Sequence, residues 1–199
     1  MKVLHVYRTC YPETKGGVEQ VIRYITKGCQ GSGVESKILA LSDTENKKFI
    51  HENTEVILTK KIFELASNSF SLGMFIEFYK LSNWADIIHY HYPWPSGDLL
   101  SILNYSKPTV ITYHSDIIKQ KFLKRIYFPL EQFFLSKASV IVATSPQYAA
   151  SSKTLIKFNK KVEVIPLAID PEDYKHTNDA LDTEMKNRYG TNFFYLLVY

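Results

Sequence analysis

The chain has 199 residues, of which 45% are hydrophobic, 22% charged and 14% aromatic. This composition is that of a globular protein and excludes a wholly disordered chain. No apolar run reaches the roughly 18 to 20 residues of a membrane-spanning helix, the first residues lack the apolar core of a secretory signal, and two cysteines are too few for a disulfide framework. We therefore expect a cytoplasmic protein. The net charge of +4 does not by itself indicate a nucleic-acid partner.

Short apolar runs alternate with longer amphipathic ones along the chain. Runs rich in β-branched and aromatic residues predict strands at 2–7, 35–41, 51–58, 86–89, 109–113, 139–143 and 162–165. Apolar residues at helical spacing predict helices at 18–29, 72–81, 96–105, 117–136 and 146–158. Because parallel strands need a crossover and a helix is the usual one, the alternation predicts an α/β fold. We expect a Rossmann-like, doubly wound parallel sheet with helices on both faces.

The last thirty residues differ from the rest in composition. Residues 171–192 are polar, and 193–199 form an apolar run at the end of the sequence. We expect a Rossmann-like domain over 1–170, an interdomain linker over 171–192, and at 193–199 the first strand of a second domain that is truncated here. The alternative is that 193–199 is an edge strand of the same sheet.

Ligands of open parallel sheets bind beyond the carboxyl ends of the strands. The loop after the first predicted strand ends in Gly16 and Gly17, directly before a helix. Glycines let a ligand approach the backbone closely, and the helix N-terminus offers free N–H groups and a positive dipole end that suit a phosphate. A plain turn is the alternative, since neither the dinucleotide fingerprint nor a P-loop is present. Glu19 lies in the first turn of the predicted helix. We expect it to contact a ligand or, as the alternative, to cap the helix, where its negative charge interacts favourably with the helix dipole.

A second candidate region follows the strand at 86–89. His91 and Tyr92 stand there among further aromatic residues and prolines. Aromatic side chains with few polar neighbours suit the apolar faces of sugars or lipids. The alternative is a buried aromatic loop packed on the next helix. A metal site would need a third ligand, and the neighbouring sequence offers none, so we expect no metal.

A third candidate region follows the strand at 109–113, where His114 is close to Asp116. A histidine at a strand end can exchange a proton near neutral pH or bind a sugar hydroxyl without proton transfer. The alternative is a structural histidine with a backbone partner. A hydrolase triad is not expected, because the Gly-x-Ser-x-Gly nucleophile motif is missing.

The predicted helix at 117–136 and the lysine after it carry the whole net charge of the chain. Basic residues interleave with aromatic ones, and the four near its start are Lys119, Lys121, Lys124 and Arg125. A basic amphipathic helix can lie on an anionic membrane surface or hold an anionic acceptor. The alternative is a solvated basic face above a core-facing aromatic stripe. We expect no nucleic-acid partner, because no recognised nucleic-acid-binding module is present.

Five segments in this order resemble the N-terminal half of a glycosyltransferase of family 4, of the GT-B type. They lie at 1–6, 12–19, 113–116, 142–145 and 164–170. Within that family the chain is most similar to bacterial mannosyltransferases that build lipopolysaccharide O-antigen.

The resemblance implies the N-terminal half of a GT-B fold, whose two domains face each other across a cleft. It implies a retaining hexosyltransferase that needs no metal or other cofactor and moves a sugar such as mannose from a nucleotide-sugar such as GDP-mannose. The acceptor would be a lipid-linked glycan or polysaccharide of the cell surface, which places the protein in the cytoplasm or on the inner face of the membrane.

By position in that family, Gly16 and Gly17 would lie near the donor diphosphate or the acceptor hydroxyl. His114 would contact the transferred sugar. The cations that neutralise the leaving phosphate belong to the second domain, so we expect this chain to be inactive alone. The alternative function is a non-catalytic module that binds sugars or lipid head groups.

Overall fold

The computed structural model describes residues 1–65, 68–104, 106–117, 121–174, 183 and 186–188. Backbone contacts divide the chain into two compact units, Met1–Ala168 and Ile169–Tyr199. In the second unit a short 3₁₀ turn spans Pro171–Tyr174. The predicted linker at 171–192 lies mostly outside the described residues and the predicted strand at 193–199 lies wholly outside them, so both stay predictions.

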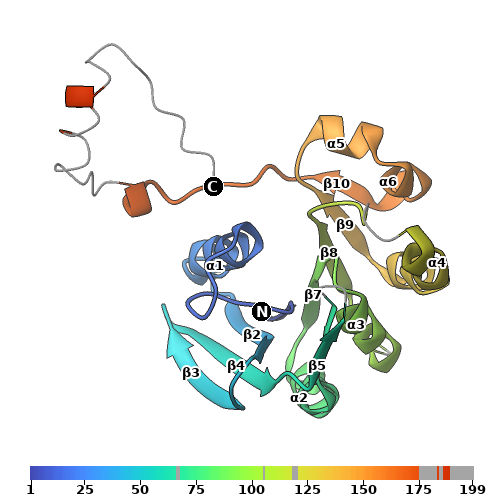
Figure 1. Cartoon of the computed structure of the whole chain (residues 1–199), viewed down its shortest axis with the longest axis horizontal. Coiled ribbons are helices and arrows are strands. Elements are labelled where there is room, and N and C mark those ends of the chain that lie inside the picture. The colour runs from blue at the N-terminus through green and yellow to red at the C-terminus, as the bar shows by residue number, and fades with distance from the viewer. Residues whose placement is uncertain (66–67, 105, 118–120, 175–182, 184–185, 189–199) are drawn as a thin grey trace. The chain divides into compact units, whose positions relative to one another are not determined.

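An eight-stranded sheet organises the first unit, with its strands in the order β10-β9-β8-β7-β1-β2-β4-β3 (Figure 1). Their bounds are β1 Lys2–Val6, β2 Glu35–Ser42, β3 Lys47–His51, β4 Thr54–Lys60, β7 Ile87–Tyr92, β8 Thr109–Tyr113, β9 Val140–Ala143 and β10 Val162–Val164. All neighbouring strands are parallel except the antiparallel pair β3 and β4. The predicted doubly wound parallel sheet is therefore confirmed. A separate small hairpin joins β5 Phe63–Leu65 to β6 Asn68–Phe70.

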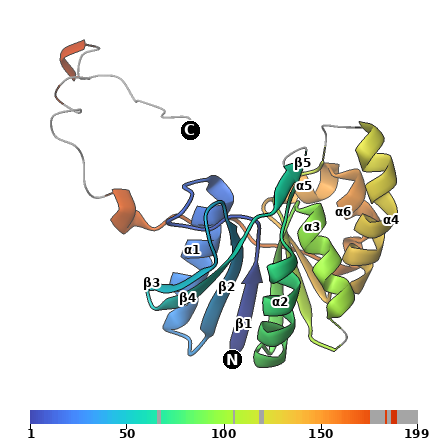
Figure 2. The same ribbon diagram turned by 60° about the horizontal axis from the view of Figure 1, so that its bottom comes forward.

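Helices cover both faces of the sheet, as expected. Figures 1 and 2 show α1 on one face and α2, α3 and α4 on the other. The helix bounds are α1 Gly17–Gln30, α2 Leu72–Trp84, α3 Pro95–Asp98, α4 Lys121–Lys137, α5 Pro146–Ser151 and α6 Lys153–Lys157. Two short 3₁₀ helices complete the unit, η1 Leu99–Leu103 and η2 Asn159–Lys161.

The main core lies between the sheet and α2 to α4. Successive side chains of a strand point to opposite faces, so alternate residues of β7 enter this core. Tyr90 is 2% exposed, and its ring lies 5.2 Å from that of Phe134 in α4 and 6.2 Å from that of Phe78 in α2. The intervening residues of β7 point to the face that carries α1.

Two predicted elements are each divided in the structure. The predicted strand at 51–58 starts at the end of β3 and continues into β4, and the chain turns between the two at Glu52 and Asn53, which have positive φ angles of 45° and 60°. Asn is among the residues that adopt this conformation most readily. The predicted helix at 146–158 breaks at Ser152, whose backbone is extended and whose hydroxyl accepts from the Leu155 N–H to begin α6. A capping serine ends one helix and starts the next here.

Candidate functional site

The candidate site lies at the carboxyl edge of the sheet, where the strand order changes direction. From β1 the chain crosses to β2 on one side, while β7, β8, β9 and β10 follow one another on the other side. Such a switch point opens a crevice between the carboxyl ends of its two central strands. The loop before α1, the N-terminus of α1 and the segment after β8 all belong to this edge. The structure thus places Gly16, Gly17 and His114 at the same edge.

The N-terminus of α1 is occupied by a carboxylate of its own first turn. Glu19 is 9% exposed and lies so close to Gly16 that a Cβ atom there would overlap its carboxylate. Thr14 Oγ1 donates to Glu19 Oε1 at 2.9 Å and fixes this arrangement. A Cβ at Gly17 would meet nothing within 4 Å, so backbone access is open at this position. Glu19 therefore sits where the helix dipole favours a negative charge.

His114 directly follows β8 and is held from two sides. Its backbone N–H donates to the Tyr92 carbonyl at 3.0 Å, which extends the pairing of β7 and β8 by one residue. Its Nε2 lies 3.2 Å from His91 Nδ1. Burial lowers the pKa of His114 to about 4, against the opposing effect of the Glu19 carboxylate. At neutral pH His114 is consequently an uncharged hydrogen-bonding group.

Three histidines of β1 and β7 and a fourth directly after β8 lie on the face that carries α1, and we call His5, His89, His91 and His114 the histidine row. The strand register pairs His5 of β1 with His89 of β7. His5 Nδ1 lies 3.3 Å from His91 Nε2, and His89 Nε2 lies 2.7 Å from Thr112 Oγ1. His5 and His91 are only 1% and 2% exposed. Burial lowers the pKa of His5 to about 4 and those of His89 and His91 well below the usual range.

The histidine row bears on the metal question. The sequence argument that no third ligand stands near His89 and His91 is wrong, because the fold brings His5 beside them from another strand, with ring nitrogens within 4.8 Å of one another. A shared metal would need the ring lone pairs to converge in the ring planes. The rings of His89 and His91 are instead stacked, with centroids 4.5 Å apart and an interplanar angle of 24°. Their geometry favours stacking and hydrogen bonding over coordination.

Tyr92 points to the face opposite His91, because the two residues are neighbours on one strand. It is fully buried, its hydroxyl donates to Glu131 Oε1 of α4 at 2.5 Å, and its ring stacks on Tyr113 with centroids 4.4 Å apart. His91 is buried as well. The structure therefore buries both residues inside the domain, as the alternative expected, but on strand β7 rather than in a loop packed on the next helix.

Asp116 connects the segment after β8 to the helices that follow β9. Its carboxylate accepts hydrogen bonds from the hydroxyls of Tyr113 at 2.9 Å, Tyr148 at 3.1 Å and Ser152 at 3.0 Å. Hydrogen bonds to a charged group are stronger than those between neutral groups. Asp116 thus anchors the backbone that presents His114, two residues away.

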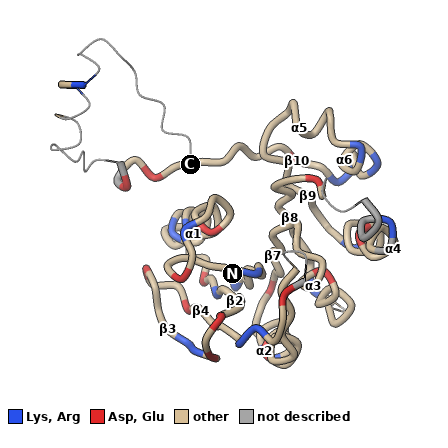
Figure 3. Tube along the Cα trace, viewed as in Figure 1, with Lys and Arg blue, Asp and Glu red and all other residues tan. Residues whose placement is uncertain are grey.

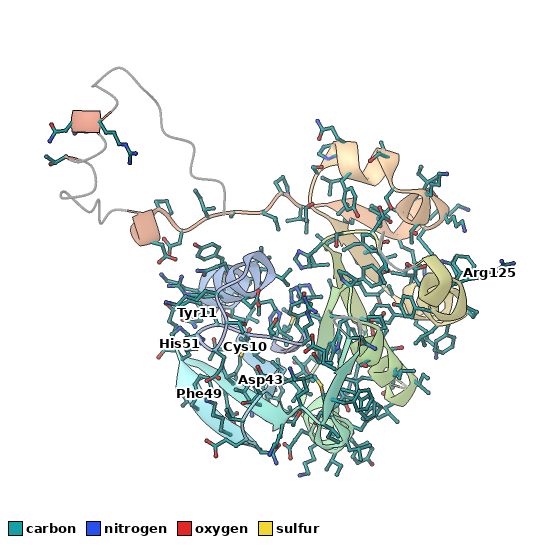
Figure 4. The ribbon with its side chains drawn as sticks, in the orientation of Figure 1. Cys10, Tyr11, Asp43, Phe49, His51 and Arg125 are labelled. Atoms are coloured by element: carbon teal, nitrogen blue, oxygen red, sulfur yellow. The ribbon has the colours of Figure 1, made fainter. Side chains whose placement is uncertain are left out.

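The basic residues of α4 are only partly described. Lys119 lies outside the described residues, and Lys121 and Lys124 lie on α4 with side chains outside the description. Arg125 is exposed and extends away from the helix (Figure 4). Further lysines lie on α6 and on the turn after it, so that basic residues gather over both elements (Figure 3).

Large apolar side chains are also exposed on α4 and α6. Phe128 and Phe133 are 40% and 41% exposed, and Ile156 is 50% exposed. The Lys157 ammonium lies 4.9 Å from the centre of the Phe128 ring, and the Lys137 ammonium lies 5.3 Å from that of Phe133. We call these five residues, together with Arg125, the basic–aromatic surface.

A polar pocket of about 300 Å³ lies at the carboxyl ends of β1, β2 and β4 and was not predicted from the sequence. Arg8, Asp43, Lys61 and Glu64 are among its lining residues (Asp43 is labelled in Figure 4). Lys61 Nζ lies 2.5 Å from Asp43 and 2.8 Å from Glu64. The sequence could have indicated this pocket, because several lining residues directly follow predicted strands, where ligands of parallel sheets bind.

The mostly parallel sheet with helices on both faces defines a Rossmann-like domain of the α/β class. The sequence profile of Glycosyltransferase Family 4 matches residues 15–173. The chain therefore belongs to Glycosyltransferase Family 4. No described helix is long and apolar enough to cross a membrane.

Two curated relatives match almost the whole chain. O-antigen chain mannosyltransferase C of Escherichia coli is 42% identical over 198 residues, and D-rhamnosyltransferase WbpZ of Pseudomonas aeruginosa is 36% identical over 196 residues. Each alignment covers 98% of this chain but only 53% and 51% of the relative. The chain thus spans about half the length of the curated relatives it matches.

Among solved structures, Anabaena Alr3699/HepE in complex with UDP and glucose superposes with a TM-score of 0.64 at 15% identity. The superposition covers 94% of this chain and 50% of that one. At this level of identity the likeness shows the fold, and it agrees with the expected half of a GT-B glycosyltransferase.

Proposed function

We propose that this chain forms the acceptor-side half of a retaining, metal-independent glycosyltransferase that transfers a hexose from a nucleotide-sugar. The observation that carries the proposal is the meeting of the α1 N-terminus and His114 at the switch-point edge, in a chain of Glycosyltransferase Family 4. The name of the E. coli relative supports O-antigen as the product and mannose, which we expect to come from GDP-mannose, as the first sugar to test, and the name of the P. aeruginosa relative makes D-rhamnose the second.

Breaking the bond between a sugar and a diphosphate develops negative charge on the leaving group, which needs preorganised positive groups. We assign one such contribution to the open backbone at Gly17, because the Glu19 carboxylate already occupies the positive end of α1 beside Gly16. His114, uncharged at neutral pH, supplies a hydrogen bond to the transferred sugar. We place the acceptor hydroxyls in the polar pocket near Arg8 and Lys61, because charged side chains at strand ends suit the many hydroxyls of a glycan.

The test is a fusion of this chain to the second half of the E. coli O-antigen chain mannosyltransferase C. Transfer from GDP-mannose to a lipid-linked glycan is measured, and NMR of the product reports whether the anomeric configuration is retained. We expect transfer by the fusion, no transfer by the 199-residue chain, and an unchanged rate in EDTA. In the fusion, His114→Ala should lower kcat by about 100-fold or more, with little change in melting temperature.

His51→Ala is the matched control, because His51 lies on β3 at the far edge of the sheet from β8. It should transfer at the wild-type rate. Wild-type transfer by the His114→Ala fusion would remove His114 from the site. A fusion that binds sugar or lipid head groups yet transfers no sugar from any common nucleotide-sugar would favour the non-catalytic binding module instead.

We further propose that the basic–aromatic surface rests on the cytoplasmic face of an anionic membrane. Exposed rings beside ammonium groups are typical of surfaces that bury apolar groups at the lipid boundary while cations contact acidic head groups. Co-sedimentation with vesicles containing phosphatidylglycerol should exceed that with neutral vesicles and fall as salt rises. Phe128→Ser with Phe133→Ser should abolish it, and binding that ignores both lipid charge and salt would contradict an electrostatic contact.

A further inference from the structure

The histidine row contains a linear chain of three imidazole rings. The ring centroids of His5 and His91 are 5.6 Å apart and those of His91 and His114 are 5.5 Å apart, with interplanar angles of 24° and 22°. These separations exceed the N···N distances of 3.3 and 3.2 Å by about the width of one ring. The facing nitrogens therefore lie on the lines joining the centroids, so the rings meet edge to edge, as in an N–H···N hydrogen bond.

Both contacts join neutral rings at hydrogen-bonding distance. His5 and His91 are almost wholly buried, and burial keeps the pKa values of His5 and His114 near 4 and that of His91 well below its usual range. A neutral imidazole has one N–H donor and one acceptor nitrogen. Each contact in the chain joins an Nδ1 to an Nε2. Only two proton orders satisfy both contacts: all three protons on Nδ1, or all three on Nε2.

The charge at one end of the chain selects between these orders. Burial lowers the pKa of both His114 and His5, and the Glu19 carboxylate opposes this effect at His114 but not at His5. The negative charge of Glu19 therefore lies at the His114 end of the three imidazole rings. It favours the order in which His5 donates to His91 and His91 donates to His114, because each ring dipole then turns its positive end toward Glu19.

We propose that His5 and His91 are positioning residues that hold His114 with its proton on Nδ1, so that His114 offers the substrate an N–H donor. The ligand group that fits this donor is an acceptor oxygen, such as a sugar hydroxyl or a phosphate oxygen. The contact with substrate rests on the proposed function, while the proton order of the three rings does not. His89 is not one of these three hydrogen-bonded rings, because its ring stacks on His91 and its Nε2 contacts Thr112.

The test uses long-range ¹H–¹⁵N correlation spectra of the 199-residue chain labelled at histidine, recorded at pH 7.5. Protonated and unprotonated ring nitrogens resonate far apart, so the spectra read each tautomer directly. We expect His5, His91 and His114 all to carry the proton on Nδ1, whereas free neutral histidine prefers Nε2. An Nε2 proton on any of the three rings in the wild-type chain would overturn the inference.

Two substitutions test how the order is set. His5→Phe removes the first donor, and Glu19→Gln removes the charge at the other end. Each should shift His114 toward the Nε2–H form. His5→Asn places an amide donor near the position of Nδ1 and should restore the wild-type His114 spectrum. If His5→Phe does not fold, Glu19→Gln and His5→Asn still decide the matter. Wild-type His114 signals in Glu19→Gln would overturn the inference.

Activity separates the two proposals. In the fusion described above, His5→Phe should lower kcat several-fold with KM unchanged, and His5→Asn should recover most of the loss. Equal kcat in the wild type and in a folded His5→Phe fusion would overturn the positioning role. Three Nδ1 protons in a protein whose fusion transfers no sugar would refute the proposed function and leave the proton order standing.

Discussion

Acidification should destabilise this protein through its buried histidines, and His5 is the simplest case to work out. The pKa of His5 is lowered from 6.5 to about 4 because the ring is buried. Below pH 6.5 the unfolded chain takes up a proton that the folded chain does not bind, so the stabilisation is complete above pH 6.5 and is lost as the pH falls toward 4. The free energy of unfolding falls by about 1.4 kcal/mol for each pH unit between these two pKa values, so the full loss is about 3 kcal/mol.

By pH 5 the loss due to His5 alone should be about 2 kcal/mol, because most of the window has then been crossed. The free energy of unfolding is measured by urea titration at pH 7.5 and pH 5.0, with fluorescence of the two tryptophans, Trp84 and Trp94, as the signal. The wild type should lose about 2 kcal/mol more between these pH values than His5→Asn, which keeps a polar group but cannot take up the proton.

Val3→Ala is the control for this measurement. Val3 lies on the same strand and face, two residues from His5, and is 8% exposed. Its truncation should lower the free energy of unfolding equally at both pH values, so the pH dependence stays that of the wild type. If His5→Asn shows the same loss between pH 7.5 and 5.0 as the wild type, the reasoning from a buried neutral imidazole is refuted.

Two further outcomes follow from packing and from a buried carboxyl. A Cβ at Gly97 would overlap the Trp94 ring, so Gly97→Ala should lower the free energy of unfolding by about 1–3 kcal/mol in urea. Gly28→Ala, with open space in the last turn of α1, should instead raise the free energy of unfolding by up to about 0.5–1 kcal/mol, and equal effects of the two substitutions would contradict the overlap. Burial raises the pKa of Asp98 well above its usual range, so the folded protein holds the Asp98 proton more tightly than the unfolded chain does. The stabilisation due to this proton is complete below about pH 4 and is lost as the pH rises. Asp98→Asn should therefore gain stability relative to wild type between pH 4 and 7 in thermal melts, and parallel profiles would count against it.

Local patterns predicted most of the sheet. The β-rich runs at 2–7, 109–113 and 139–143 match β1, β8 and β9 to within a residue or two. Parallel strands that are buried on both faces have short, continuous apolar sequences, which makes them easy to recognise. The misses came from single residues that end or turn an element. Asn53 reverses the chain between β3 and β4, and Ser152 separates α5 from α6.

The candidate site was only partly predictable. Position after a strand correctly brought Gly16, Gly17 and His114 to one edge, because the carboxyl ends of parallel strands share an edge. Grouping His91 with Tyr92 as one binding loop overlooked that they are neighbours on a strand. The alternation of side chains sends them to opposite faces, a signal that was present in the sequence.

The sequence by itself determined the alternation of strands and helices and the polar residues that follow each strand, because both depend on neighbours along the chain. It did not determine that His5 lies beside His89 and His91. That contact depends on the register between β1 and β7, strands more than eighty residues apart that are aligned by packing of both faces of the sheet. The burial that keeps these imidazoles neutral, and the ring order that presents His114, were likewise decided only by the tertiary structure.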